Sequence, residues 1–250
     1  MSHPDFRNKV AEITLLFWLM KIVATTLGET FGDFLSMTMN LGYLSGIGIT
    51  ILFFLVVMWI QLNVDTYVPY RYWLVIIATT TLGTEISDYL DRTLHFGYIL
   101  GSLTLFTGLI LILFFWYRRF KTIRVYPIYE KNKEVYYWLA ILLSNSLGTA
   151  FGDLLSDVAG FSYLQGALIT ATVIAVVVAL HYWTAFNEVF LFWLAFIFTR
   201  PFGATFGDFL TKPVARGGLQ FSTLLASLVS VTLLIGLIVL ESRRYEGSIR

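Results

Sequence analysis

The stretch FWLMKIVATTLGETFGDFLS, residues 17–36, decides the fold because it returns three more times in the chain. The other copies read YWLVIIATTTLGTEISDYLD from residue 72, YWLAILLSNSLGTAFGDLLS from residue 137 and FWLAFIFTRPFGATFGDFLT from residue 192. In every copy a tryptophan precedes an aspartate by 15 positions; the pairs are Trp18 and Asp33, Trp73 and Asp88, Trp138 and Asp153, and Trp193 and Asp208. Internal repeats define an architecture before any single motif does. The sequence therefore predicts four similar units.

The composition is that of an integral membrane protein. Hydrophobic residues make up 57% of the 250 residues and charged residues only 13%, and the mean hydropathy is +0.75. A spanning helix needs about 20 mostly apolar residues. Eight stretches satisfy this requirement: residues 13–37, 42–62, 69–90, 96–117, 135–156, 161–183, 187–210 and 219–240. We expect an all-α polytopic protein, and no removable signal peptide, because the first stretch lacks a small-residue cleavage site.

Each of the four units consists of the repeated stretch, which forms one span, and the span that follows it. Because each unit has two spans, all four units enter the membrane in the same direction and form parallel helical hairpins. The first helix of each hairpin carries a pair of small residues four positions apart, which lets helix backbones approach closely. These pairs are Gly28 and Gly32, Gly83 and Ser87, Gly148 and Gly152, and Gly203 and Gly207. We expect the odd-numbered, acidic helices at the centre and the even-numbered helices outside.

The chain divides into two halves. Successive tryptophans lie 55, 65 and 55 residues apart, so a longer link joins the second and third copies. We expect repeats one and two in residues 1–120, a basic cytoplasmic linker in residues 121–134 that lies near anionic lipid headgroups, and repeats three and four in residues 135–250.

Lysine and arginine predict the orientation. Twelve of them lie on the side that holds both termini: Arg7, Lys9, Arg71, Arg118, Arg119, Lys121, Arg124, Lys131, Lys133, Arg243, Arg244 and Arg250. Three lie on the other side: Arg92, Lys212 and Arg216. The positive-inside rule therefore places both termini in the cytoplasm.

The four tryptophans and the Gly-x-x-x-Gly-Asp stretches resemble a family of bacterial membrane proteins of unknown function, built from four tandem two-helix repeats. The resemblance covers nearly the whole chain. It implies a multi-pass protein of the bacterial inner membrane and brings no established activity.

The aspartates point to a function. Each lies roughly 22 Å along its helix from its tryptophan, in the outer third of the membrane if tryptophan anchors the helix at the cytoplasmic interface. A carboxylate inside a bilayer is costly unless it faces a cavity or a partner. The alternative is that each aspartate only caps its own loop.

Two glutamates add to the aspartates. Glu29 and Glu85 precede Asp33 and Asp88 by four and three residues, so each pair shares one helix face. We expect Glu29, Asp33, Glu85 and Asp88 to converge as oxygen ligands for a divalent cation such as Mg²⁺, Ca²⁺ or Mn²⁺. Without a cation they would hold protons, as in a cation/proton antiporter.

A second resemblance concerns the motif GETFGD, residues 28–33, which is similar to the Glu-x-Gly-Asp motifs of two-repeat manganese and calcium exporters. The spacing here is one residue longer, and Phe34 stands where those exporters carry a basic residue. The resemblance implies only that such acid pairs suit cation export.

The second half of the chain differs at one polar position. Where the first two copies have Thr25 and Thr80, the others have Asn145 and Arg200. Arg200 is either an internal counter-ion that competes with the cargo or half of a static ion pair. Asp153 and Asp208 are expected to complete the polar centre. Lys21 is expected to snorkel to the cytoplasmic surface without a chemical role.

Other classes of function lack their motifs. There is no cysteine, the three histidines have no metal-ligand spacing, and no Gly-x-Ser-x-Gly or phosphate loop is present. We expect no enzyme, no cofactor and no nucleic-acid partner. The sequence favours a transporter that exports a Mn²⁺-like cation in exchange for protons. The alternatives are an organic-acid or oxyanion transporter that uses Arg200, and a scaffold or assembly protein held by an acid–arginine lock.

Overall fold

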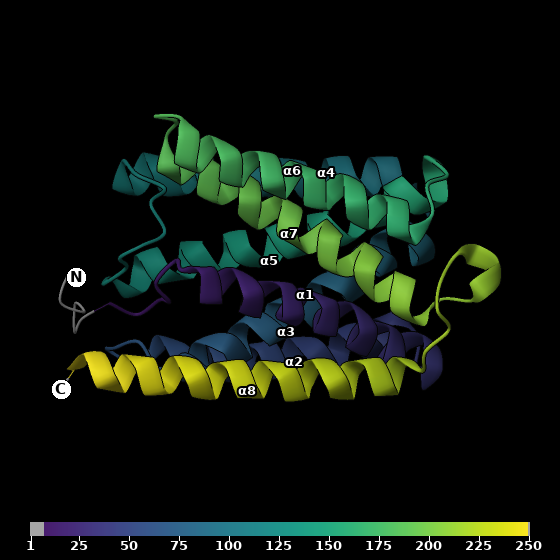
Figure 1. Cartoon of the computed structure of the whole chain (residues 1–250), viewed down its shortest axis with the longest axis horizontal. Coiled ribbons are helices and arrows are strands. Elements are labelled where there is room, and N and C mark those ends of the chain that lie inside the picture. The colour runs from purple at the N-terminus through teal and green to yellow at the C-terminus, as the bar shows by residue number, and fades with distance from the viewer. Residues whose placement is uncertain (1–7, 250) are drawn as a thin grey trace.

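The computed structural model describes residues 8–249, which form helices and connecting loops. Arg7 and Arg250, which contribute to the predicted orientation, lie outside these residues. The long helices run side by side along one axis, and the two ends of the described chain lie at the same end of the bundle (Figure 1). The helices are α1 (Leu15–Asp33), α2 (Tyr43–Leu62), α3 (Pro69–Asp88), α4 (Gly97–Phe120), α5 (Lys131–Asp153), α6 (Tyr163–Trp183), α7 (Glu188–Thr211) and α8 (Thr223–Ile249).

Short turns follow the odd-numbered helices. After their aspartates, α1, α3 and α5 continue into the π-helical turns η1 (Phe34–Thr38), η2 (Tyr89–Thr93) and η3 (Leu154–Val158). Helix α7 instead ends at Thr211 and is followed by the 3₁₀ turn η4 (Val214–Arg216). Helix α5 begins at Lys131, so the linker ends at residue 130 and not at residue 134 as predicted.

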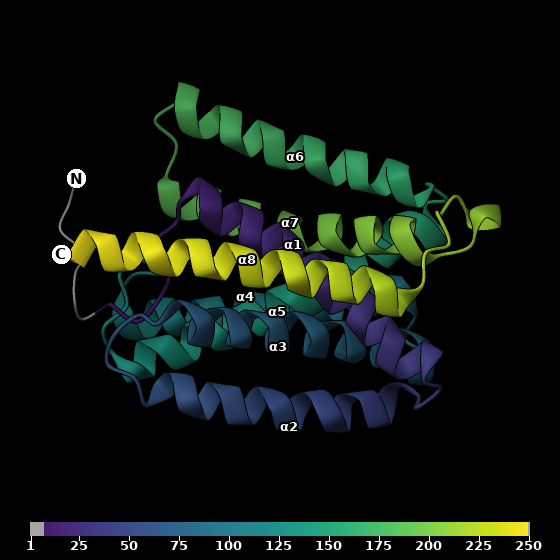
Figure 2. The ribbon, with the colours of Figure 1, turned by 60° about the horizontal axis from the view of Figure 1, so that its bottom comes forward.

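The odd-numbered helices form a central ring in which α1 and α5 each pack against both α3 and α7. The even-numbered helices surround this ring, with α2 on α3, α4 on α5, α6 on α7 and α8 on α1 (Figures 1 and 2). The second helix of each repeat therefore packs on the first helix of the next repeat, and α8 closes the circle. This exchange joins the two predicted halves into one bundle.

Burial separates the two classes of helix. In the membrane-spanning windows of α1, α5 and α7, 61–67% of the residues are buried, against 22–28% in α2, α4, α6 and α8. The prediction that the acidic helices are central is confirmed. Seven of the described helices are long and apolar enough to cross a membrane, and these do not include α3. Helix α3 is as long as α2, but fifteen of its 20 residues are buried, so its polar residues are shielded by the neighbouring helices.

The close approach of the ring helices depends on glycine. At each contact between neighbouring ring helices, a glycine of one repeat faces a larger residue of the next repeat. The glycine lies five positions before its own aspartate, and the larger residue lies eight positions before its own. A methyl group at that glycine would overlap its neighbour. The pairs are Thr80 over Gly28, Asn145 over Gly83, Arg200 over Gly148 and Thr25 over Gly203.

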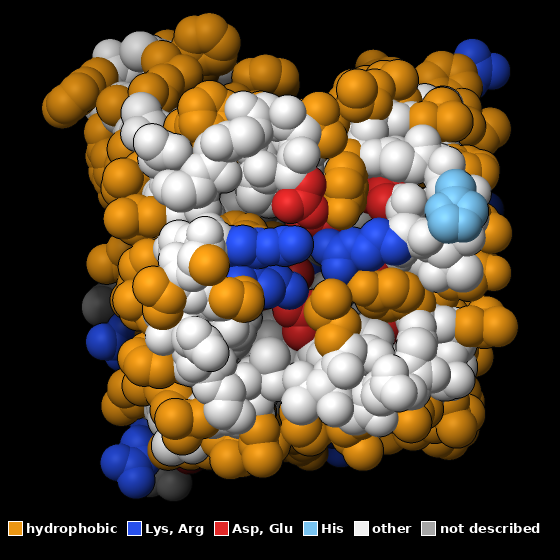
Figure 3. Space-filling model, turned by 90° about the vertical axis from the view of Figure 1, so that its right-hand side faces the viewer, with side chains coloured by type: hydrophobic (Ala, Val, Ile, Leu, Met, Phe, Trp, Pro, Cys, Tyr) orange, Lys and Arg blue, Asp and Glu red, His pale blue; other side chains and the backbone are white. Residues whose placement is uncertain are grey.

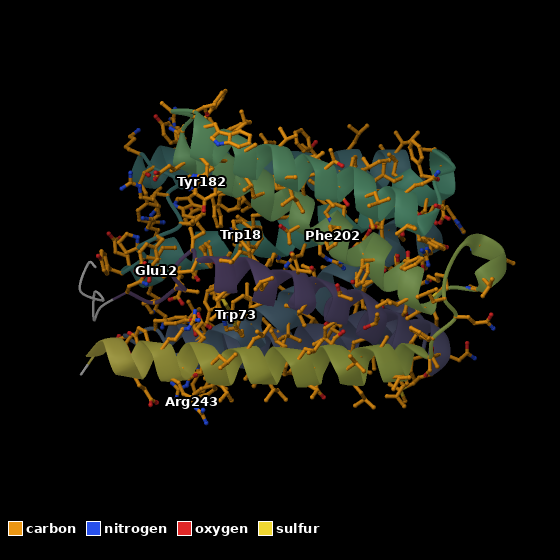
Figure 4. All side chains as sticks on the ribbon, in the orientation of Figure 1. Glu12, Trp18, Trp73, Tyr182, Phe202 and Arg243 are labelled. Carbon is orange, nitrogen blue, oxygen red and sulfur yellow. The ribbon has the colours of Figure 1, made fainter. Side chains whose placement is uncertain are left out.

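The tryptophans are not interface anchors. Trp73 and Trp138 are fully buried and Trp193 is almost so, while Trp18 is partly exposed. They lie toward the end of the bundle that holds the chain ends, as Figure 4 shows for Trp18 and Trp73. Fifteen residues are slightly more than four helical turns, so each tryptophan lies on nearly the same face as its aspartate. The indole N–H of Trp73 donates to Glu241 of α8 at 2.7 Å and that of Trp193 donates to the carbonyl of Ile123 at 3.1 Å, so these side chains pack between the helices.

Candidate functional site

The four aspartates converge at the end of the ring away from the chain ends. Arg92, in η2, joins two of them: its Nη2 lies 3.1 Å from Oδ2 of Asp153, and its Nη1 lies 3.6 Å from Oδ2 of Asp88. The first of these contacts connects repeat two to repeat three.

Lys212, directly after α7, joins the other two aspartates. Its Nζ lies 2.6 Å from Oδ2 of Asp33 and 3.3 Å from Oδ1 of Asp208. Arg92 and Lys212 each follow the aspartate of their own repeat by four residues, while repeats one and three have Met37 and Asp157 at that position. The cations therefore alternate around the ring, and each binds its own aspartate and that of the next repeat.

The network lies below a cleft of 740 Å³ whose lining includes Arg92, Asp153, Asp208 and Lys212. The aspartates are buried, whereas the side chains of Arg92 and Lys212 are 25% and 19% exposed. Figure 3 shows this face, with Lys and Arg side chains in the middle and acidic atoms beside and beneath them. Lys212 lies one residue beyond the spanning part of α7. Burial opposes its charge, but Asp208 and Asp33 outweigh burial and raise the pKa of Lys212 well above its ordinary value.

Glu29 lies one helical turn deeper than Asp33. Its Oε2 is 2.9 Å from Nη2 of Arg200, which also donates to Oγ1 of Thr84 at 2.5 Å. Glu29 and Arg200 are both buried. One carboxylate oxygen from each of Glu29, Asp33 and Asp208 lies within 4.8 Å of the other two. These three residues, from α1 and α7, are the carboxylate set that the structure offers to a cation.

Of the predicted ligand group, the structure brings Glu29 and Asp33 together with Asp208. Glu85 points toward Gly46 of α2, and both of its carboxylate oxygens are buried without a hydrogen-bond partner among the described residues. Glu29 precedes its aspartate by four residues and Glu85 by three, which turns them apart by about 100°. Repeat one has Thr30 where repeat two has Glu85, and the hydroxyl of Thr30 accepts a hydrogen bond from Ser227 of the outer helix α8. Asp88 is held by Arg92, and Asp208 takes its place in the carboxylate set.

Asn145 and Lys21 form a polar pair deeper in the ring. The Nζ of Lys21 donates to Oδ1 of Asn145 at 2.8 Å and lies 3.9 Å from the ring centroid of Phe196. Asn145 in turn donates to Oγ1 of Thr79 at 3.1 Å. Lys21 is fully buried, so the prediction that it snorkels to the surface was wrong. A line of polar groups thus runs inside the ring from Lys21 through Arg200 to the aspartates.

A family named "Repeat of Unknown Function (DUF347)" matches residues 16–67, 71–122, 136–186 and 191–245. The chain belongs to this repeat family. Each match covers one ring helix and the outer helix that follows it, so the four DUF347 repeats coincide with the four copies seen in the sequence. No curated protein and no solved structure matches the chain.

The sequence interpretation missed the two cations of the network. It counted Arg92 and Lys212 only as charges on the outer side. The signal was present, because each follows the aspartate of its own DUF347 repeat by four residues, a spacing at which side chains meet on a helix. Their bonds to the next repeat were not predictable from spacing, because they depend on the order of helices around the ring.

A second polar network, also missed, closes the end near the chain ends. Lys9 pairs with Glu134 at 2.6 Å, and the hydroxyls of Tyr72 and Tyr137 lie 2.5 Å apart. The residues involved are buried. Together with the buried tryptophans of the DUF347 repeats, they pack the end of the bundle opposite the cleft.

Proposed function

We propose that this protein is a secondary transporter, not an enzyme, that exchanges a divalent cation for protons through the carboxylate set. The observation that carries the proposal is the convergence of Glu29, Asp33 and Asp208, buried and within 4.8 Å of one another, beneath an open cleft. Carboxylate oxygens suit hard or borderline cations such as Mg²⁺, Ca²⁺ and Mn²⁺. Transporters built from repeats bind their cargo inside the membrane at the interface of the repeats, and the location of the carboxylate set between repeats one and four supports the proposal.

Protons are the proposed counter-ion. Buried carboxylates of like charge bind protons when no cation neutralises them, and acidic residues within spans often form proton relays. The line of polar groups from Asp33 through Arg200 to Lys21 supports a route along the ring axis. In the arrangement described here the cleft is open and the other end is filled, so transport requires the network around Tyr72 and Tyr137 to open while the cleft closes.

We place the protein in the bacterial inner membrane with both chain ends in the cytoplasm. The support is the excess of lysine and arginine near the chain ends, including the exposed Lys131 and Arg243 of the described structure. The cleft then opens to the outside, and a cation that leaves the carboxylate set through it is exported.

The experiment is transport by the purified protein in lipid vesicles, with a Mn²⁺-quenched dye and a pH-sensitive dye inside. Wild-type vesicles should take up Mn²⁺ and change their internal pH in the same experiment. Asp33→Asn and Asp208→Asn should abolish both signals, and Asp65→Asn, which removes an exposed acid from a loop, should change neither. Wild-type vesicles that move neither Mn²⁺ nor protons would overturn the proposal.

The second candidate is a non-transporting scaffold or assembly protein. It is favoured by the two bridges of Arg92 and Lys212, which together bind an aspartate from every repeat. The exchange Lys212→Asp with Asp33→Lys separates the two functions. If the double variant regains both the stability and the function lost in each single variant, the network is a lock. If it regains stability alone, the carboxylates serve a cargo.

An oxyanion or organic-acid transporter is less well supported. Arg200, the cation that would bind such an anion, is fully buried and already bonded to Glu29 and Thr84. Of the cations that line the cleft, Arg92 and Lys212 are themselves paired with the four aspartates.

A further inference from the structure

The two bridges of the aspartate network are unequal. The bridge of Lys212 adjoins Glu29, which adds a third carboxylate. At the matching position of repeat three, next to the bridge of Arg92, the residue is Thr149, four positions before Asp153. Within the described part of the chain, only the lysine bridge therefore lies in a set of three acids whose oxygens approach one another this closely.

Among the described residues neither cation satisfies both of its aspartates, since Oδ1 of Asp88 beside Arg92 and Oδ1 of Asp208 beside Lys212 both lack a hydrogen-bond donor, but only Asp208 belongs to the set of three acids. The Nζ of Lys212 is close to Asp33, but Oδ1 of Asp208, at 3.3 Å, lies in ion-pair range without accepting a hydrogen bond. Asp208 is 4% exposed, so this oxygen is a buried acceptor without a donor. An oxygen of this kind, aimed into a set of acids, is an open position for a cation.

The two cations also differ in their freedom to leave. Arg92 donates from Nη1 to the hydroxyl of Tyr43 at 2.9 Å and from Nη2 to Asp153, which fixes its planar guanidinium at two points. Lys212 lies just beyond the end of α7 with an extended backbone, on a flexible four-carbon side chain beside the cleft. A rotation of its side chain would move the ammonium from the acids into the cleft without a change in the helices.

We infer that Lys212 is a built-in substitute for the transported cation, one that occupies the carboxylate set when the cargo is absent and moves into the cleft when a divalent cation binds. Arg92 is the permanent counterpart that holds the other pair of aspartates. This inference rests on the proposed function and specifies how the same site is kept neutral between cargo ions.

The test is equilibrium binding of Mn²⁺ to the full chain in detergent, followed by the loss of the electron paramagnetic resonance signal of free Mn²⁺. Lys212→Met removes the competing charge and keeps the length of the side chain, so it should bind Mn²⁺ about tenfold more tightly than wild type. Arg92→Met, the matched control, should bind no more tightly than wild type. Lys212→Arg should bind more weakly, because a guanidinium bonds carboxylates at two points and leaves less readily.

The results separate this inference from the proposed function. If wild-type vesicles transport Mn²⁺ but Lys212→Met binds it no better, or if Arg92→Met gains as much, Lys212 is not a substitute for the cargo and the transporter proposal remains. If no variant binds Mn²⁺, both are overturned. Thermal unfolding of each variant, together with Lys212→Gln as a second neutral replacement, shows whether a lost signal reflects a lost fold.

Discussion

Lys212 of the fourth repeat bonds Asp33 of the first repeat across 179 residues of sequence, and this contact closes the ring of helices. The same closure is made outside the ring by α8, which packs on α1. Repeats one and four thus meet as consecutive repeats do elsewhere in the chain. The carboxylate set lies at this junction, where the first and last ring helices meet.

The pairing of Glu29 with Arg200 predicts a large loss of stability when one partner is removed. Glu29→Gln leaves a guanidinium that is fully buried and without its counter-charge, and we expect a loss of about 3–5 kcal/mol. The measurement is reversible unfolding in mixed micelles. Adding Arg200→Met to the same chain should restore most of the loss. A double variant as unstable as Glu29→Gln alone would show that the ion pair is not the cause.

Glu85 predicts a contrast in metal binding. Because its carboxylate lies between Gly46 of α2 and Gly32 of α1, outside the set of three acids, Glu85→Gln should lower the affinity for Mn²⁺ much less than the loss of a member of that set. Asp208→Asn should lose most of that affinity, although the sequence interpretation did not include Asp208 among the metal ligands. Titration of the two variants under the same conditions decides between the ligand set predicted from the sequence and the set that the structure offers, and equal losses would favour the predicted set.

Part of the fold and of the site could be predicted from the sequence, as the ring glycines and Glu85 show. The repeated glycines were enough to place the acidic helices at the centre, since only small residues allow four helices to approach so closely. The direction of Glu85 was also readable, because its position corresponds to Thr30 and not to Glu29. The packing of each outer helix against the next repeat could not be predicted from the sequence. Outer helices such as α2 expose apolar residues to lipid over most of their surface, and hydropathy alone does not identify the partner.

The packing of glycines in the ring predicts a steric effect. Gly203→Ala would drive a methyl group into Thr25 of the neighbouring ring helix, and we expect it to cost about 1–3 kcal/mol of stability. Gly236→Ala on α8 is the control, since nothing lies near its added methyl group and alanine favours a helix. Thermal unfolding in detergent compares the two. Equal midpoints would contradict the close approach of α1 and α7.

The absence of cysteine makes the orientation directly testable, because a single introduced cysteine is the only thiol in the chain. Val214 lies in η4 at the cleft end and is 67% exposed, while Arg243 is exposed near the end of α8 at the opposite end of the bundle (Figure 4). In intact cells stripped of their outer wall, a membrane-impermeant maleimide should label Val214→Cys and leave Arg243→Cys unlabelled. In inside-out vesicles the pattern should reverse, because the charge bias puts the chain ends in the cytoplasm. Labelling of Arg243→Cys in intact cells would reverse the assigned orientation and turn the proposed export into uptake.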